Sequence, residues 1–169
     1  ARPQLAEDLA GRLDRPFARA DMEAFLATPP CADEDALHQR LRHLRQRVWL
    51  VTTARDLAGD ADLAEVVATW SALAETGIAA ALDFHHAALA ARHGEPRDAE
   101  GRPQHMVVVG MGKLGGGELN VSSDIDLLFA YDADGETRPR PGGGEIRPLS
   151  NHEFFIRLGR RVIPAISDV

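Results

Sequence analysis

Two long apolar stripes with helical spacing constrain the fold of this chain more than any other feature of its sequence. Between residues 33 and 57 the apolar positions recur at intervals of four, three, four and three residues, as one buried face of a helix requires. A second stripe fills residues 61–93, and only Ala58, Gly59 and Asp60 separate the two. So short a turn predicts two antiparallel helices that pack against each other. The positions of the first stripe are Leu37, Leu41, Leu44, Val48 and Val51.

The residues before and within the stripes lead to further expectations. Residues 1–27 predict one or two short helical pieces, and TPPC (28–31) breaks them because proline lacks an amide donor. Trp49 and Trp70 are predicted to be core residues that join the two long helices. The histidines of the second stripe are predicted to lie on the surface, since no carboxylate or cysteine completes a metal-binding set with them. These histidines are His85, His86 and His93.

The sequence changes character after the polar segment GEPRDAEGRP (94–103), which we interpret as a linker. The β-branched run MVVVGM (106–111) predicts a buried strand, because such uninterrupted apolar runs are typical of strands covered on both faces. IDLLFAY (125–131) predicts a second strand.

The last part of the chain predicts a loop followed by a helix. Residues 132–148 are rich in glycine, proline and charged residues, which predicts a long turn-rich loop. Ser150 and Glu153 then fit the capping box of a helix that continues to about Ile166. The predicted class is α+β, with an antiparallel helical region followed by a smaller domain that contains a sheet. The predicted domains are residues 1–103 and residues 104–169.

The glycine run GMGKLGGG (110–117) contains G-x-G-x-x-G after a predicted strand, which is the fingerprint of a dinucleotide-binding fold. That fold needs a parallel crossover of a dozen or more residues, usually a full helix. Only nine steps lead from Gly115 to Asp124, and the residues between them include weak helix formers. There is room for about one helical turn, near residues 117–120. A P-loop is excluded as well, because leucine follows Lys113 where serine or threonine is required.

Asp124 and Asp126 flank Ile125 in the second predicted strand. Because side chains of a strand alternate between its faces, both carboxylates are predicted to point the same way. Burying two carboxylates is unfavourable unless a cation compensates them, and Mg²⁺ takes one or two carboxylates together with phosphate oxygens and waters. Two such ions, about 3.5–4 Å apart, stabilise both the attacking and the leaving oxygen of a phosphoryl displacement.

The surroundings of the two acids favour this interpretation. Upstream glycines let backbone amides approach phosphate, and a helical turn that starts at Gly116–Gly117 would add a favourable dipole. The alternative is that Asp124 caps the end of a strand and Asp126 belongs to a solvated face. Here the acids follow a glycine cluster and two serines within an apolar run. The sequence therefore predicts a metal-dependent site for phosphoryl or nucleotidyl transfer.

Residues 110–129, GMGKLGGGELNVSSDIDLLF, resemble the signature of the glutamine synthetase adenylyltransferases, a family of the DNA polymerase beta-like nucleotidyltransferase superfamily. LRHLRQRVWL (41–50) and NHEFFIRLGRRVI (151–163) agree more loosely, so the resemblance covers about residues 36–169. It implies a polymerase beta-like core with a small mixed sheet. Members of the family are bifunctional: one half attaches AMP from ATP to a tyrosine of glutamine synthetase, and the other removes it by phosphorolysis, which yields ADP.

The resemblance also implies a role for individual residues. Asp124 and Asp126 match the metal-binding pair, which would hold two Mg²⁺ ions and carry catalysis. The positions that match the nucleotide- and phosphate-binding loop are Gly115, Gly116, Ser123 and Lys113, although Lys113 fits a solvated loop lysine equally well. The family uses a third acid on a later strand, and no candidate strand lies between Asp132 and Val169. We therefore expect an incomplete core that is inactive as a separate fragment.

The Gly-Met-Gly opening, Asn120 and the Asp-Ile-Asp triplet resemble the adenylyl-removing half more than the attaching half. Removal of AMP from glutamine synthetase is therefore the predicted activity, with ADP or ATP and inorganic phosphate as small-molecule substrates. Two alternatives remain. The segment could be the attaching half, or it could be a degenerate regulatory module that binds nucleotide or a PII-type signal protein without chemistry.

Composition limits the partners. The formal net charge of −7 argues against non-specific binding to nucleic acid or to an anionic membrane surface. A single cysteine, Cys31, excludes an internal disulfide framework and suits a reducing cytosol. No signal peptide or membrane-spanning run is apparent, so we expect a bacterial cytoplasmic enzyme. The resemblance implies glutamine synthetase, a PII-type signal protein and the remainder of the full-length enzyme as partners.

Overall fold

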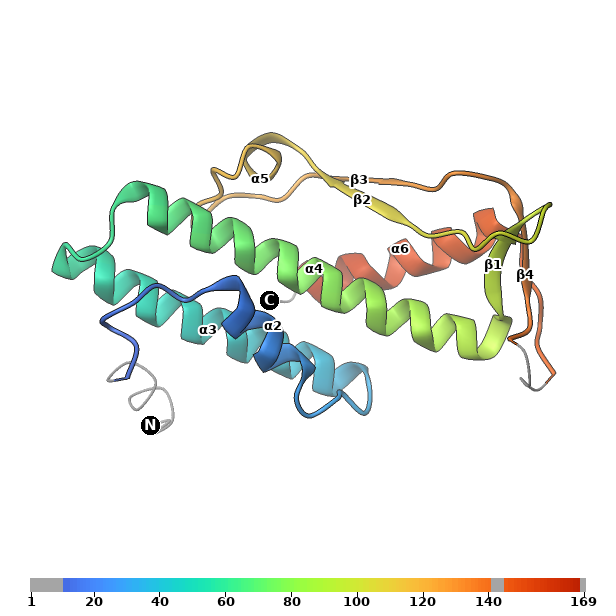
Figure 1. Ribbon diagram of the computed structural model, residues 1–169, viewed down its shortest axis with the longest axis horizontal. Coiled ribbons are helices and arrows are strands. Elements are labelled where there is room, and N and C mark those ends of the chain that lie inside the picture. The colour runs from blue at the N-terminus through green and yellow to red at the C-terminus, as the bar shows by residue number, and fades with distance from the viewer. Residues whose placement is uncertain (1–10, 141–144, 168–169) are drawn as a thin grey trace. The chain divides into compact units, whose positions relative to one another are not determined.

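The computed structural model describes residues 11–140 and 145–167, and it forms two compact units (Figure 1). The first comprises residues 11–79 and 110–126, and the second comprises 80–109 with 127–140 and 145–167. In chain order the elements are α2 (Arg19–Ala27), α3 (Glu34–Ala58), α4 (Leu63–His93), β1 (Glu95–Asp98), β2 (Val107–Gly110), α5 (Gly112–Gly115), β3 (Leu127–Ala130), β4 (Gly135–Arg138) and α6 (Asn151–Ser167). This combination of helices and small sheets confirms the α+β class. Residues 1–10 of the predicted N-terminal helical pieces lie outside the described residues.

Helix α3 begins and ends where its sequence predicts. The side chain of Asp33 caps it by accepting a hydrogen bond of 2.8 Å from the amide of Ala36. At the other end Gly59 adopts a left-handed conformation with φ of 80° and donates to the carbonyls of Arg55 and Asp56. All five positions of the predicted apolar stripe are buried.

The first half of α4 packs antiparallel to α3 within the first unit. Near the connecting turn, the Arg55 guanidinium is bidentate to Glu65, with 2.8 Å between Nε and Oε1. Further from the turn, a Cβ placed at Gly77 would lie 3.6 Å from Cδ2 of Leu41. Later residues of α4 thus contact earlier residues of α3: Glu65 contacts Arg55, and Gly77 lies beside Leu41. This order confirms the predicted antiparallel pair.

The two tryptophans differ from each other. Trp70 on α4 is 6% exposed and belongs to the core of the first unit, as predicted. The same prediction is wrong for Trp49, which is 47% exposed. Trp49 follows Val48 on α3, and successive residues of a helix are rotated by about 100°, so its side chain leaves the buried stripe.

In the second unit, β1 and β4 form an antiparallel ribbon with Glu95 opposite Arg138 and Asp98 opposite Gly135. The predictions of a linker at 94–103 and of a loop over all of 132–148 are therefore wrong. Glycine signals that are typical of loops here permit strand contact: a Cβ at Gly135 would lie 2.0 Å from the carbonyl oxygen of Arg97.

Helix α6 provides the core of the second unit. Ser150 accepts a hydrogen bond of 3.1 Å from the amide of Glu153, which confirms the predicted helix start. The aromatic ring of Tyr131 lies over Phe155 on this helix, with 4.8 Å between the ring centroids. The buried residues of this core are Ala81, Leu89, Ala90, Phe154, Phe155, Leu158, Val162 and Ala165.

The histidines of α4 are mostly interior, so the prediction of surface positions is wrong. His85 is 1% exposed and His93 is 4% exposed. Nδ1 of His93 donates to the carbonyl of Arg147 at 2.7 Å, and the ring of His85 packs edge-on against Phe84.

Strands β2 and β3 form a second two-stranded sheet, separate from β1 and β4. The amide of Met111, just after β2, donates to the carbonyl of Asp126, just before β3, at 2.9 Å. The end of one strand therefore meets the beginning of the other, which makes the ribbon antiparallel and is incompatible with the parallel crossover of a dinucleotide fold. Within the described residues two antiparallel ribbons replace the expected mixed sheet.

Burial of β2 also differs from the prediction. Val107 is 56% exposed and Val109 is 42% exposed, whereas the apolar run predicted a strand covered on both faces. A two-stranded ribbon has one face toward its own unit, and the described residues leave the other face open.

In the described part of the chain, none of the helices has the length and hydropathy required to cross a membrane.

Candidate active site

The two predicted metal-binding acids precede β3 instead of lying within it. The sequence predicts a strand from Ile125, but β3 begins at Leu127, and Asp124 and Asp126 occupy an irregular, exposed segment. The alternation rule for strands therefore does not apply to these two side chains, and their shared orientation stays a prediction. The backbone of Asp126 is nevertheless fixed, because its carbonyl accepts the bond from Met111.

The carboxylates of Asp124 and Asp126 are unpaired within the part of the chain that the structure describes. Among the described residues, none forms a hydrogen bond or an ion pair with either carboxylate. Two negative charges separated by one residue repel each other, and exposure to water is what makes the pair tolerable without a cation. Their oxygens remain available to an external ligand.

A compact turn leads into Asp124. The side-chain oxygen of Asn120 accepts hydrogen bonds from the amide and the hydroxyl of Ser122, each 3.2 Å long, and from the hydroxyl of Ser123 at 2.7 Å. The amide of Ser123 donates to the carbonyl of Asn120 at 3.1 Å, which closes a four-residue turn. Sequence reasoning noticed Asn120 only as part of the family resemblance.

The predicted phosphate ligand Ser123 is already engaged in this turn. Its hydroxyl donates to the side-chain oxygen of Asn120 and accepts a bond of 3.2 Å from the backbone amide of Asn120. Nζ of Lys113, an exposed residue of α5, lies 3.5 Å from the same hydroxyl. Lys113 and Ser123 thus lie together in the segment that precedes Asp124. Whether either contacts phosphate stays a prediction.

The helical turn in the glycine run lies earlier than predicted. It is α5, Gly112–Gly115, and not a turn near residues 117–120. The amide of Gly115 donates to Met111 at 3.2 Å and that of Gly116 donates to Gly112 at 3.0 Å. The backbone N–H groups of Gly115 and Gly116 are therefore engaged within the chain, and the expected dipole at Gly116–Gly117 is absent.

The two glycines predicted to face phosphate meet different surroundings. A Cβ at Gly115 would lie 2.5 Å from the carbonyl oxygen of Gly110, so only glycine fits there. At Gly116 the nearest atom to such a Cβ would be 3.6 Å away. Close approach of the backbone to itself explains Gly115, while a Cβ at Gly116 would make ordinary van der Waals contacts.

Helix α4 anchors the whole segment. Leu114 and Leu119 are 5% and 4% exposed and belong to the core of the first unit. The buried hydroxyl of Ser71 on α4 accepts a bond of 3.2 Å from the amide of Leu119, immediately before Asn120. No sequence signal pointed to Ser71, because a serine inside an amphipathic helix has no motif of its own.

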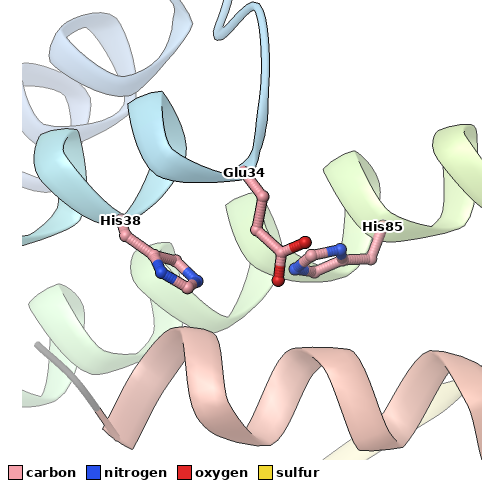
Figure 2. Close-up of side chains that lie close together, drawn as sticks. All are labelled: Glu34, His38 and His85. Atoms are coloured by element: carbon pink, nitrogen blue, oxygen red, sulfur yellow. The ribbon is translucent and has the colours of Figure 1, made fainter.

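A pair of potential metal ligands lies elsewhere in the first unit. Glu34 and His38 stand one turn apart at the start of α3 (Figure 2). Two side chains are fewer than the three or four protein ligands of a transition-metal centre, so α3 by itself does not form one. Figure 2 also labels His85, a residue of the second unit described above.

Comparison with known proteins identifies the family. The family model described as Glutamate-ammonia ligase adenylyltransferase matches residues 2–169. The chain belongs to this family. The match confirms the resemblance carried by the glycine run and the two acids.

Individual relatives agree. The chain is 48% identical over 171 residues to the bifunctional glutamine synthetase adenylyltransferase/adenylyl-removing enzyme of Nitrosomonas europaea, with 98% of the chain and 18% of that protein covered. A protein of the same name from Burkholderia mallei is 50% identical over 175 residues, with 99% of the chain and 18% of that protein covered. The chain thus spans about 18% of the length of these members of the adenylyltransferase family.

Proposed function

We propose that this segment contributes the adenylyl-removing site of a bifunctional enzyme, with a polymerase beta-like core. Its substrate is the AMP-modified tyrosine of glutamine synthetase. An oxygen of inorganic phosphate attacks the adenylyl phosphorus, the bond from phosphorus to the tyrosyl oxygen breaks, and that oxygen takes up a proton. The products are ADP and unmodified glutamine synthetase. Support comes from family membership together with the names of the relatives, which include adenylyl removal.

The observation that carries the proposal is the exposed, unpaired state of Asp124 and Asp126 beside the glycine run. Their oxygen donors suit Mg²⁺, which takes one or two carboxylates and completes its shell with waters and phosphate oxygens. When bound there, Mg²⁺ supplies positive charge that stabilises the phosphate oxygens during displacement. Asp124 and Asp126 would hold the ions, one or two in number.

The neighbouring residues would handle the phosphate groups. The ammonium of Lys113 lies beside Ser123, so it adds a positive charge on the side of the turn that precedes Asp124. Gly116 carries no side chain that would hinder the approach of a phosphate to the backbone. In this proposal Ser123 holds the turn and offers its hydroxyl to phosphate beside Lys113.

A PII-type signal protein and the remainder of the enzyme act as regulatory partners in the same proposal.

Replacing either acid in the full-length enzyme tests the proposal. Asp124→Asn and Asp126→Asn are each expected to lower the rate of ADP release from adenylylated glutamine synthetase at least about a thousandfold, since each removes a charged metal ligand without changing shape. The separate attachment of AMP from ATP should persist. Glu118→Gln, which neutralises an exposed acid in the same loop, is the matched control and should retain removal. Normal phosphorolysis by either aspartate variant would refute the assignment.

The attaching activity is the second candidate, because the names of the relatives contain both activities. The same variants distinguish the two. If the segment attaches AMP, Asp124→Asn abolishes release of pyrophosphate from ATP and leaves phosphate-dependent ADP release intact.

A further inference from the structure

We propose that Asn120 is a positioning residue that sets the placement of Asp124 and Asp126 for metal binding, an inference that rests on the proposed function. Asn120 touches neither acid in the structure. It acts through the turn formed by Ser122 and Ser123, which leads directly into Asp124.

The chemistry of the contact explains why asparagine suits this position. One side-chain oxygen accepts all three bonds, at 3.2, 3.2 and 2.7 Å. A carbonyl oxygen has two lone pairs, so three donors use its full accepting capacity. Among residues 11–140 and 145–167, every hydrogen bond of the Asn120 side chain is made by its oxygen and none by its nitrogen. The required feature is therefore a short side chain ending in an oxygen acceptor.

The position of Asn120 in the segment explains why its loss would be felt at the acids. Upstream, Leu119 is buried and its amide is bound to Ser71 on α4. Downstream, the carbonyl of Asp126 is bound to Met111. Between these two anchors, the turn held by Asn120 provides the side-chain hydrogen bonds that the structure describes. Without the Asn120 side chain, the turn would keep the backbone bond from Ser123 to Asn120 and the bond from the Asn120 backbone amide to the Ser123 hydroxyl, but it would lose all three bonds to the side-chain oxygen.

A metal site is sensitive to such loosening. Ligands must be held within about 0.5 Å of their productive positions, and removing groups that orient metal ligands typically weakens metal affinity or activity by about 10–100-fold. Asn120→Ala in the full-length enzyme should therefore raise the Mg²⁺ concentration for half-maximal adenylyl removal by about 10–100-fold. The KM for adenylylated glutamine synthetase should remain unchanged, because Asn120 is proposed to act through the turn and not by contact with the substrate.

Asn120→Asp is the conservative variant that isolates the oxygen acceptor. Aspartate keeps the length and the accepting oxygen, so it should restore most of the wild-type rate. The comparison is made on the Mg²⁺ concentration for half-maximal removal and on Mg²⁺ affinity measured by isothermal titration calorimetry, both at high ionic strength, where salt screens the added negative charge. Equal impairment of the Ala and Asp variants would overturn the proposal, and so would a wild-type Mg²⁺ dependence of Asn120→Ala.

Two further measurements keep the test decisive. If Asn120→Ala does not fold, as judged by circular dichroism, Ser122→Ala removes one of the three donors and should raise the Mg²⁺ requirement in the same direction by a smaller factor. An unchanged requirement would overturn the proposal. Asp124→Asn is assayed in parallel: if it retains removal, the proposed function fails, whereas loss there with a normal Asn120→Ala defeats only this inference.

Discussion

Two sites in this molecule use aspartate in opposite ways. Asp98, at the end of β1 in the second unit, is 2% exposed and accepts bonds from the Arg102 amide at 2.7 Å and the Arg102 guanidinium at 2.6 Å. Asp124 and Asp126 in the first unit are exposed, and the described residues provide no partner for their carboxylates. A carboxylate whose charge is compensated inside the fold serves the fold. A pair left uncompensated has charge available for a cation from outside.

The electrostatics of Asp98 support this distinction. Burial favours its neutral form, but hydrogen bonds from the backbone and side chain of Arg102, together with the guanidinium charge, outweigh that effect and hold the pKa of Asp98 below its ordinary value. The charged form of Asp98 is therefore part of the folded state of the ribbon.

The largest effect is expected when Asp98 is removed. Asp98→Ala removes the acceptor of the hydrogen bond that the Arg102 backbone amide donates. Loss of this bond should accelerate hydrogen exchange of the β1 and β4 amides at least about a hundredfold. The matched control is Asp126→Ala, which removes an exposed carboxylate and should change stability by no more than about 0.5 kcal/mol. Hydrogen exchange measured by mass spectrometry checks both, and similar effects of the two variants would break the comparison.

Acid should reproduce much of the Asp98→Ala effect in the wild-type chain. Because the pKa of Asp98 is lower in the folded state than the unfolded value of about 3.9, its contribution is present above that value and is lost as pH falls through the folded pKa. Urea unfolding monitored by circular dichroism at pH 5.5 and pH 3 measures the loss. Asp98→Asn should show a smaller difference between the two pH values, and an unchanged difference would contradict this assignment.

Magnesium should separate the two sites with a smaller effect. At a Mg²⁺ concentration ten times its Kd, binding should slow hydrogen exchange that requires opening of the site by about tenfold. We expect this protection over residues 120–126 in the wild-type chain and in Asp98→Asn, and none in Asp124→Asn. If the protection disappears with Asp98→Asn, the ion binds at Asp98 and not at the pair Asp124 and Asp126.

His86 should give the smallest effect. Burial lowers its pKa, and the carboxylate of Glu95, 3.7 Å from its Nε2, opposes that shift in part. The folded pKa therefore lies below the unfolded value of about 6.5, so the unfolded state binds more protons and stability decreases as pH falls through that value. His86→Gln should flatten the change in urea midpoint between pH 7.5 and 5.5, and a steeper change would show that Glu95 dominates.

The helical part of the fold could be predicted well because its signals are local. The stripe from Leu37 to Val51, the cap at Asp33 and the left-handed Gly59 all follow from spacing and backbone chemistry, and the structure contains each of them. The β1–β4 ribbon could not be predicted in the same way. Its strands have four residues each, are polar, and pair across about forty positions of sequence, so neither period nor propensity identifies them.

The candidate site was predicted in composition more than in geometry. The motif assigned Lys113 and Ser123 to the phosphate-binding loop and the two acids to the following strand, and the structure brings Lys113 to Ser123. The motif could not show that Asp124 lies outside β3, or that the hydroxyl of Ser71 on α4 accepts a hydrogen bond from the amide of Leu119. That last contact joins residues 48 positions apart, and a buried serine hydroxyl leaves no repeating pattern in a sequence.

The short distance between Gly115 and Gly110 has a consequence for the acids. A methyl group on residue 115 would press against the carbonyl of Gly110 at 2.5 Å. Displacement of that carbonyl would shift the next amide, that of Met111, which is the group bound to Asp126. The bend is thus tightly packed at Gly115, and a single added carbon atom there would displace, through one hydrogen bond, the backbone carbonyl of an aspartate eleven residues away.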